Sequence, residues 1–134
     1  MLEIRYLGHS AVWLSDGKTK VVIDPFLTGN PLAPVGVGEV QADLILVTHA
    51  HGDHFGDAVA LSKKGGTVVS TFEIASYAEK HGAKAVPMNI GGTYRFPGGW
   101  LKWFPAWHSS SFPDGTYGGM PMGVGVELGG KRIY

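Results

Sequence analysis

The chain has 134 residues and is 44% hydrophobic, so it fits a single domain over residues 1–134 whose core removes about two-thirds of the unfolded surface from water. Eleven basic residues balance eleven acidic ones and Lys63–Lys64 is the longest basic run, which excludes the charge pattern of a nucleic-acid-binding surface. There is no cysteine, so the chain has no disulfide and no thiolate metal site. It shows neither a signal-peptide pattern nor a run of about 20 apolar residues, so we expect a cytoplasmic protein without a membrane partner.

The first 25 residues predict a β-meander. Apolar and charged residues alternate over 2–6, and a second strand is expected over 10–15. Asp16–Gly17 is a strong hairpin signal, and it leads into a buried strand over 21–23 that Pro25 stops. Residues 26–41 are rich in proline and glycine without a sustained period, which indicates a loop.

The middle of the chain alternates between strand and helix patterns. The apolar run 42–48 is typical of a fully buried strand, and a helix over 58–64, capped by Asp53 or Asp57, follows it. A strand over 67–71, a helix over 72–82 and a strand over 84–88 complete the pattern. This alternation predicts parallel strands with right-handed crossovers.

From residue 91 the pattern returns to β-structure. Strands are expected over 93–96, 100–107, 122–128 and 131–134, separated by glycine-containing turns or a loop. The last strand stops at Tyr134, short of the five or six residues of a typical strand. The expected fold class is α/β with a mixed sheet and helices on one face, in a domain that we expect to be truncated after Tyr134.

The stretch "THAHGDH" follows the buried strand and concentrates ionisable side chains. His49 and His51 are two residues apart, so on an extended segment they point to the same side and can converge on one ion. Asp53 and His54 follow where the chain turns, which allows them to face a second ion. Imidazole and carboxylate ligands suit zinc, manganese or iron. The competing interpretation is a polar surface loop whose residues only cap a helix.

This stretch resembles the metal-binding signature of the metallo-β-lactamase-fold hydrolase superfamily, and the order of elements agrees over the whole chain. The segments "IRYLGHSAVWL", "IDPFLTGNP", "PMNIGG" and "HSSSFPDGTYGG" are similar to small metal-dependent hydrolases related to L-ascorbate-6-phosphate lactonase. The resemblance implies the N-terminal portion of an αββα sandwich. It also implies two divalent metal ions, with zinc as the first choice and manganese or iron as alternatives.

Carried over residue by residue, the resemblance makes His49, His51 and His108 the ligands of the first metal. Asp53 and His54 become ligands of the second metal and the catalytic residues. Asp24, which alone reads equally as a turn cap, becomes a residue that braces the metal loop by hydrogen bonds.

Further side chains are weaker candidates for the pocket. His9 either lines the site or fills a turn between two strands. Ser109 and its neighbouring serines can supply hydrogen bonds around His108. Asp114, Thr116 and Tyr117 either contact the substrate or belong to an ordinary surface loop.

Members of the resembled family continue past the motifs found in this chain, with a bridging aspartate and a further histidine on the second metal. We therefore expect a C-terminal half, in the same or a second chain, that supplies these ligands and a second β-layer over the sheet. Without it, exposed apolar surface and an unpaired edge are expected to drive homo-oligomerisation.

The predicted function is hydrolysis of a small-molecule ester, lactone or phosphoester by a metal-activated water, as part of a longer or split protein. The alternative is a non-catalytic metal-binding half-domain that acts as an assembly or interaction subunit. A nuclease of the same superfamily needs a basic groove, against which the balanced charge argues. Because function depends on the pocket rather than the fold, the sequence leaves the substrate open.

Overall fold

The computed structural model describes all 134 residues and contains two β-sheets and three α-helices. In chain order the elements are β1 (Glu3–Tyr6), β2 (Val12–Ser15), β3 (Lys20–Ile23), the 3-10 helix η1 (Val37–Glu39), β4 (Leu44–Leu46), α1 (Gly52–Phe55), α2 (Ala58–Lys63), β5 (Thr67–Thr71), α3 (Phe72–Lys80), β6 (Lys84–Met88), β7 (Thr93–Phe96), β8 (Gly99–Pro105), β9 (Met122–Leu128) and β10 (Lys131–Ile133). No helix has the length and apolar character needed to cross a membrane.

The first sheet is mixed, and its six strands lie in sequence order from β1 to β6. β1, β2 and β3 pair antiparallel through short turns, whereas β3 to β6 are parallel. Parallel neighbours need a crossover connection, and α2 and α3 provide it between β4 and β5 and between β5 and β6. The predicted β-meander and the predicted βαβ units are confirmed.

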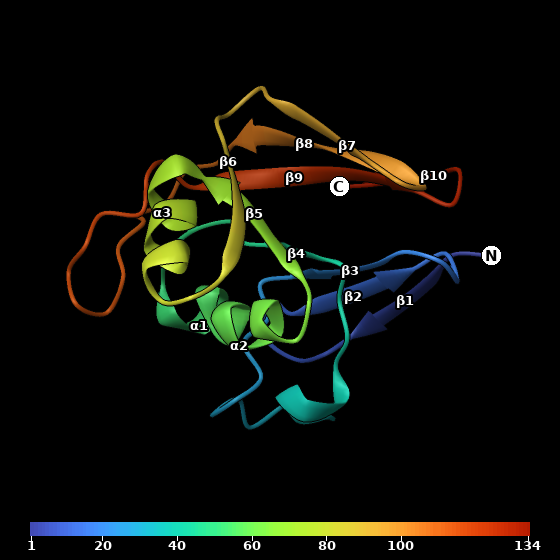
Figure 1. Cartoon of the computed structure of the whole chain (residues 1–134), viewed down its shortest axis with the longest axis horizontal. Helices are drawn as coiled ribbons and strands as arrows, with labels where there is room; N and C mark the ends of the chain where they lie inside the picture. Colours follow the sequence, from blue (N-terminus) through green and yellow to red (C-terminus); the bar gives the residue numbers. More distant parts are fainter.

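The second sheet is antiparallel, with strand order β10-β9-β8-β7, and it lies over the first sheet (Figure 1). This corrects the expectation that residues beyond Tyr134 supply the second β-layer. All four strands predicted after residue 91 are present, although the second ends at Pro105 rather than at residue 107. Nothing in their pattern indicated that they leave the first sheet. Gly91 and Gly92 exchange backbone hydrogen bonds with Trp103, so the chain crosses between layers directly after β6.

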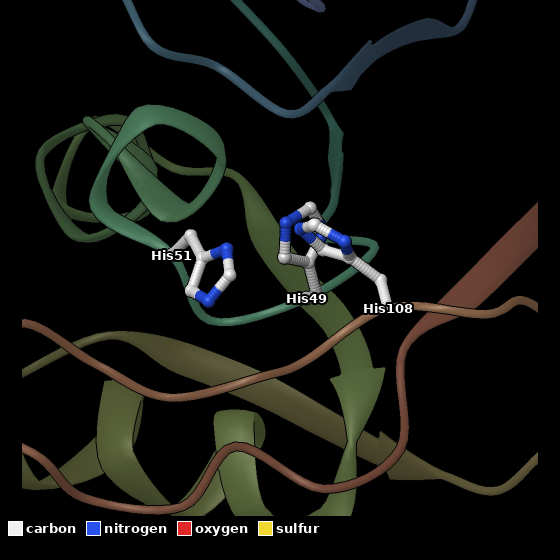
Figure 2. A group of neighbouring side chains, drawn as sticks. All are labelled: His49, His51 and His108. Carbon is white, nitrogen blue, oxygen red and sulfur yellow. The ribbon is translucent and has the colours of Figure 1, made fainter.

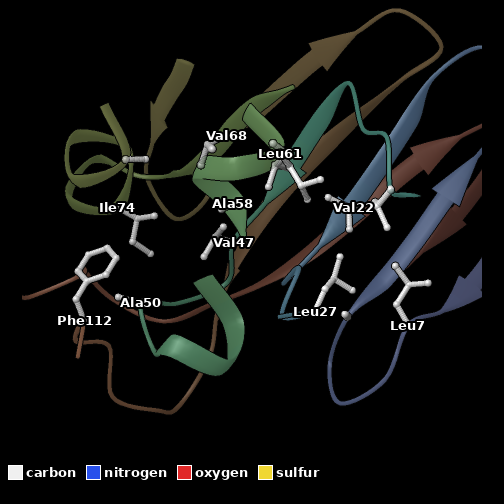
Figure 3. Packing of buried hydrophobic residues seen from close by; sticks show 14 residues of the cluster. Leu7, Val22, Leu27, Val47, Ala50, Ala58, Leu61, Val68, Ile74 and Phe112 are labelled. Carbon is white, nitrogen blue, oxygen red and sulfur yellow. The ribbon is translucent and has the colours of Figure 1, made fainter. Parts of the chain in front are cut away.

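Two hydrophobic clusters hold the layers together. The first lies where the helices cover one face of the first sheet and includes Val22, Leu61 and Ile74 (Figure 3). The second lies between the sheets and includes Leu14, Leu46 and the fully buried Trp103. The layer order is therefore helices, sheet, sheet, which agrees with the predicted mixed sheet carrying helices on one face.

The predicted cap of α2 needs correction. Neither Asp53 nor Asp57 caps α2 through its side chain, although Asp57 occupies the N-cap position. The Asp57 carboxylate instead accepts hydrogen bonds from the backbone of Leu27 and Thr28 and from the Thr28 hydroxyl, at 2.7–3.0 Å. It thus anchors the loop after β3 to the start of α2, and Asp53 lies in the separate short helix α1.

Candidate metal centre

Three histidines from both sheets meet at one corner of the sandwich. His49 and His51 follow β4 of the first sheet, and His108 follows β8 of the second. Their rings face one another (Figure 2), with centroid separations of 4.8 Å between His49 and His51, 4.7 Å between His49 and His108, and 5.0 Å between His51 and His108. One nitrogen from each ring lies within 4.8 Å of the others.

The corner is fixed by the backbone as well as by the side chains. β9 begins with a hydrogen bond from the Met122 amide to the carbonyl of Thr48, 3.0 Å long, which joins the second sheet to the residue before His49. Asp24 follows β3 and His49 follows β4, so both stand at the carboxyl ends of adjacent parallel strands. In α/β sheets this edge is where ligands bind.

Asp24 determines which nitrogen of His49 is available to a ligand. The Thr48 hydroxyl lies 2.7 Å from a carboxylate oxygen of Asp24 and 2.9 Å from Nδ1 of His49. Because a carboxylate only accepts, Thr48 donates its single proton to Asp24 and must accept from His49. Nδ1 of His49 therefore carries the ring proton, and Nε2 presents a bare lone pair to the cluster.

The same carboxylate orients His54. Nδ1 of His54 donates to Oδ2 of Asp24 over 2.8 Å, which leaves Nε2 of this ring free to bind a ligand. Asp24 is only 3% exposed and has a positive φ of 46°, a conformation that aspartate tolerates better than most residues. Its contacts make Asp24 the shared brace of two imidazoles and of the Thr48 backbone amide.

A second group of donors lies beside the first. Nε2 of His9 is 3.0 Å from Oδ2 of Asp53, and Nε2 of His54 is 3.9 Å from Oδ1 of Asp53. Ligand atoms of these three side chains also lie within 4.8 Å of one another. His54 is 4.0 Å from His49 by ring centroids, so the two groups are adjacent.

The electrostatics favour a neutral His49. Burial, and then the positive charges that His54, His51 and His108 would carry, lower the pKa of His49 to about 4. Burial of His54 would lower its pKa, but the hydrogen bond and charge of Asp24 and the charge of Asp53 together raise it. Partial burial would raise the pKa of Asp53, yet the charge of His54, a backbone hydrogen bond and His9 lower it. Asp53 is accordingly ionised at neutral pH.

The residues present fit a metal ion. Nε2 of His49 is buried and has no hydrogen-bond partner within the protein, which is costly unless another ligand satisfies it. Its lone pair faces two further imidazoles, and three histidines with an open position are a common catalytic zinc arrangement. The first group can hold a divalent cation, and the second group offers two imidazoles and a carboxylate.

The family model described as "Metallo-beta-lactamase superfamily" matches residues 4–129 of this chain. The chain belongs to the metallo-beta-lactamase superfamily. It is 87% identical over 134 residues to a UPF0173 metal-dependent hydrolase of Thermus thermophilus, and it covers 60% of that protein. It is 56% identical over 138 residues to a UPF0173 metal-dependent hydrolase of Deinococcus radiodurans and covers 61% of it.

A solved structure supports the same assignment. A novel metallo hydrolase from the archaeon Ignicoccus hospitalis matches with a TM-score of 0.83 and 32% sequence identity, over 98% of this chain and 58% of that one. The chain thus spans about 60% of the length of the curated relatives that it matches. The predicted superfamily and the predicted fold are confirmed.

In this metallo-beta-lactamase superfamily chain, the loop after His108 is packed onto the histidine loop. The hydroxyl of the buried Ser110 accepts a hydrogen bond from the amide of Ala50, the residue between His49 and His51, over 3.1 Å. Gly118 lies so close to Ala50 that a Cβ added at Gly118 would overlap the Cβ of Ala50. The added Cβ would also stand 2.7 Å from the hydroxyl oxygen of Ser110. The two histidine-bearing segments are therefore clamped together.

The clamp extends to α3. The ring of Phe112, which is 2% exposed, stacks on Tyr77 of α3 at a centroid distance of 3.6 Å. The hydroxyl of Thr71 donates to the carbonyl of Gly118 over 2.7 Å and accepts from the amide of Ile74, which caps α3. The loop that follows His108 is thus held against α3 as well as against the histidine loop.

The weaker pocket candidates separate into two sets. Ser109 lies 3.3 Å from Nε2 of His51, and Ser109 and Tyr117 line a cavity of about 450 Å³ beside His108, together with the exposed Trp107. Asp114 instead accepts hydrogen bonds from the Tyr77 hydroxyl and the Thr116 amide, so it faces α3. Asp114 and Thr116 are not among the residues that line this cavity.

A larger cavity, of about 530 Å³, lies elsewhere, between the face of β1–β3 that carries Trp13 and the loop around Val35 and Val40. It contains no histidine, so its size does not make it the reactive site. Sequence reasoning missed Thr48, whose only signal is a hydroxyl directly before His49. It pointed to Ser109–Ser111 as a set, but only the fold shows that Ser110 is the one turned inward.

Proposed function

We propose that this chain carries the metal centre of a metal-dependent hydrolase that acts on a small ester, lactone or phosphoester. The observation that carries the proposal is the buried Nε2 of His49, which lacks any protein partner and faces His51 and His108. The relatives from Thermus thermophilus and Deinococcus radiodurans share the description "metal-dependent hydrolase". Because the chain spans about 60% of their length, the activity is proposed for the longer protein.

In this proposal His49, His51 and His108 are the ligands of the first ion, and Zn²⁺ is the first choice because all three donors are imidazoles. A divalent cation held there supplies Lewis acidity, which brings the pKa of water to about 7 and polarises the scissile bond. Mn²⁺ or Fe²⁺ are the alternatives. A second ion, bound by Asp53 and His54, and a cytoplasmic location complete the proposal.

The chain's own residues would position the reactants. The Thr48–Asp24 pair keeps the proton of His49 on Nδ1 and away from the cluster. The ionised Asp53 is half-exposed, with a side chain 49% accessible, and can accept a hydrogen bond from the attacking water. Trp107 and Tyr117, in the cavity beside His108, would contact the organic part of the substrate.

Metal titration with matched variants tests this proposal. Zn²⁺ titrated into the chain by calorimetry should bind tightly, and His51→Ala and His108→Ala should each weaken the first site at least about tenfold, since each removes one of three ligands. His81→Ala is the control, because His81 lies at the end of α3 and contacts Tyr77 rather than the cluster.

Activity is then measured on the full-length Thermus thermophilus relative, with 4-nitrophenyl esters, lactones and phosphoesters. Zinc-dependent hydrolysis of one class, abolished by removal of the matching histidine, supports the proposal. Tight metal binding without hydrolysis of any class would favour the alternative, a non-catalytic metal-binding module. Absence of metal binding refutes both.

A further inference from the structure

His9 belongs to the donor group that is not part of the three-histidine cluster. It lies between β1 and β2, far along the chain from Asp53 and His54, yet its Nε2 reaches Oδ2 of Asp53 at 3.0 Å. Its ring also lies 5.3 Å from the ring of His54, at an interplanar angle of 63°. The turn between β1 and β2 therefore places His9 beside Asp53 and His54, which are adjacent in the sequence.

The backbone holds His9 in this position. Its φ is +55°, in the left-handed region that glycine adopts freely and that asparagine, aspartate and histidine adopt more often than other residues. The hydroxyl of Tyr6 donates to the His9 carbonyl over 2.9 Å, and the ring of Phe26 packs edge-on against the imidazole at 5.8 Å. Next to it, Gly8 packs against the backbone of Leu32 with no room for a Cβ.

A turn filler would not need this side chain. Glycine would adopt the same backbone conformation without strain, so the turn alone does not require an imidazole. Its contacts are a carboxylate and another imidazole, not the apolar core. Nδ1 of His54 is committed to Asp24, so its Nε2 faces the Nε2 of His9 and the carboxylate of Asp53, which already contact each other, and the three side chains form one set of donors.

We propose that His9 is a ligand of a second divalent cation, which it binds through Nε2 together with Asp53 and His54. Two imidazoles and a carboxylate leave an open coordination position and suit zinc, cobalt, manganese or iron. The side chains of His9 and Asp53 are 42% and 49% exposed, so this site is weaker and exchanges its ion faster than the buried first site. The inference rests on the proposed metal centre but not on hydrolysis.

The test is a Co²⁺ titration of the whole chain, followed by calorimetry and by the visible absorption of the bound ion. His9→Asn is the variant of choice because asparagine tolerates the positive φ, while its amide is a far poorer ligand than imidazole. His81→Asn removes a distant histidine as the matched control. His9→Gly answers the same question if the asparagine variant does not fold.

The wild-type chain and His81→Asn should bind two Co²⁺ ions. His9→Asn should keep the first site unchanged and lose the second, or weaken it at least about tenfold. Two unchanged sites in His9→Asn, a single site in the wild-type chain, or loss of the first site together with the second in a folded variant would each overturn the inference. A wild-type chain that binds no ion at all would refute the proposed metal centre as well.

Discussion

Gly118 gives a sharp test of the clamp between the two histidine-bearing segments. In Gly118→Ala the new methyl group would overlap the Cβ of Ala50 and stand 2.7 Å from the Ser110 oxygen. The Cβ of Ala50 is fixed to the backbone and cannot rotate away, so the segments must move apart. Overpacking of this kind lowers the free energy of unfolding by about 1–3 kcal/mol. Because Ala50 separates His49 from His51, the displacement also spreads the cluster.

Cation affinity reports that displacement separately from stability. Each 1.4 kcal/mol needed to bring the segments back together weakens binding about tenfold, so we expect a Zn²⁺ Kd about ten times higher or more in Gly118→Ala. The control is Gly38→Ala, since Gly38 has open space around its Cβ position and an ordinary φ. Urea unfolding and calorimetry measure both quantities. Unchanged affinity and stability in Gly118→Ala would refute the clamp.

Three further predictions concern the same contacts. Burial and the neighbouring histidines lower the pKa of His49 to about 4. Between pH 6.5 and about 4 the unfolded chain therefore gains a proton that the folded chain excludes. The free energy of unfolding falls as pH drops through this window, by up to about 3 kcal/mol. The raised pKa of His54 adds stability as pH falls to 6.5 and a constant amount below it. The His49 contribution is therefore measured as the difference in urea stability between wild type and His49→Asn, and equal slopes with pH below 6.5 would contradict it. Asp24→Asn should weaken Zn²⁺ binding about 10–100-fold, since it removes the charge that orients two imidazoles, and calorimetry at unchanged circular dichroism checks this. Phe112→Ala should lower the free energy of unfolding by about 3–5 kcal/mol, because it removes a buried ring that stacks on Tyr77. Tyr77→Phe removes only an exposed hydrogen bond and should lower it by about 1 kcal/mol or less. Similar losses for both variants in urea unfolding would show that the stack of Phe112 on Tyr77 is unimportant.

The elements of the first sheet were predictable because their signals are local. Asp16–Gly17 marks a hairpin, and alternation of apolar strands with helices marks parallel pairing. The division into two sheets was not predictable in the same way. A strand such as 93–96 has the same pattern whether it extends the first sheet or begins a second one, and the hydrogen bonds of Gly91 and Gly92 that decide this are tertiary.

The site shows the same limit. The sequence brought His49, His51, Asp53 and His54 together because they lie on one short loop, and the superfamily resemblance added His108. The ring of contacts around them depends on segments far apart in the chain. Neither the relay from Asp24 through Thr48 nor the approach of His9 to Asp53 leaves a pattern in a single sequence.

The meeting of His49 and His51 with His108 has a consequence for folding. The first two follow a strand of one sheet and the third follows a strand of the other, with more than 50 residues of chain between them. An ion held by all three is a removable cross-link between the two layers, and it stabilises only the closed sandwich. At a free concentration 100 times its Kd it would add about 2.7 kcal/mol to the stability of the fold. Metal supply would then set how strongly the closed arrangement of the two sheets is favoured over the unfolded chain.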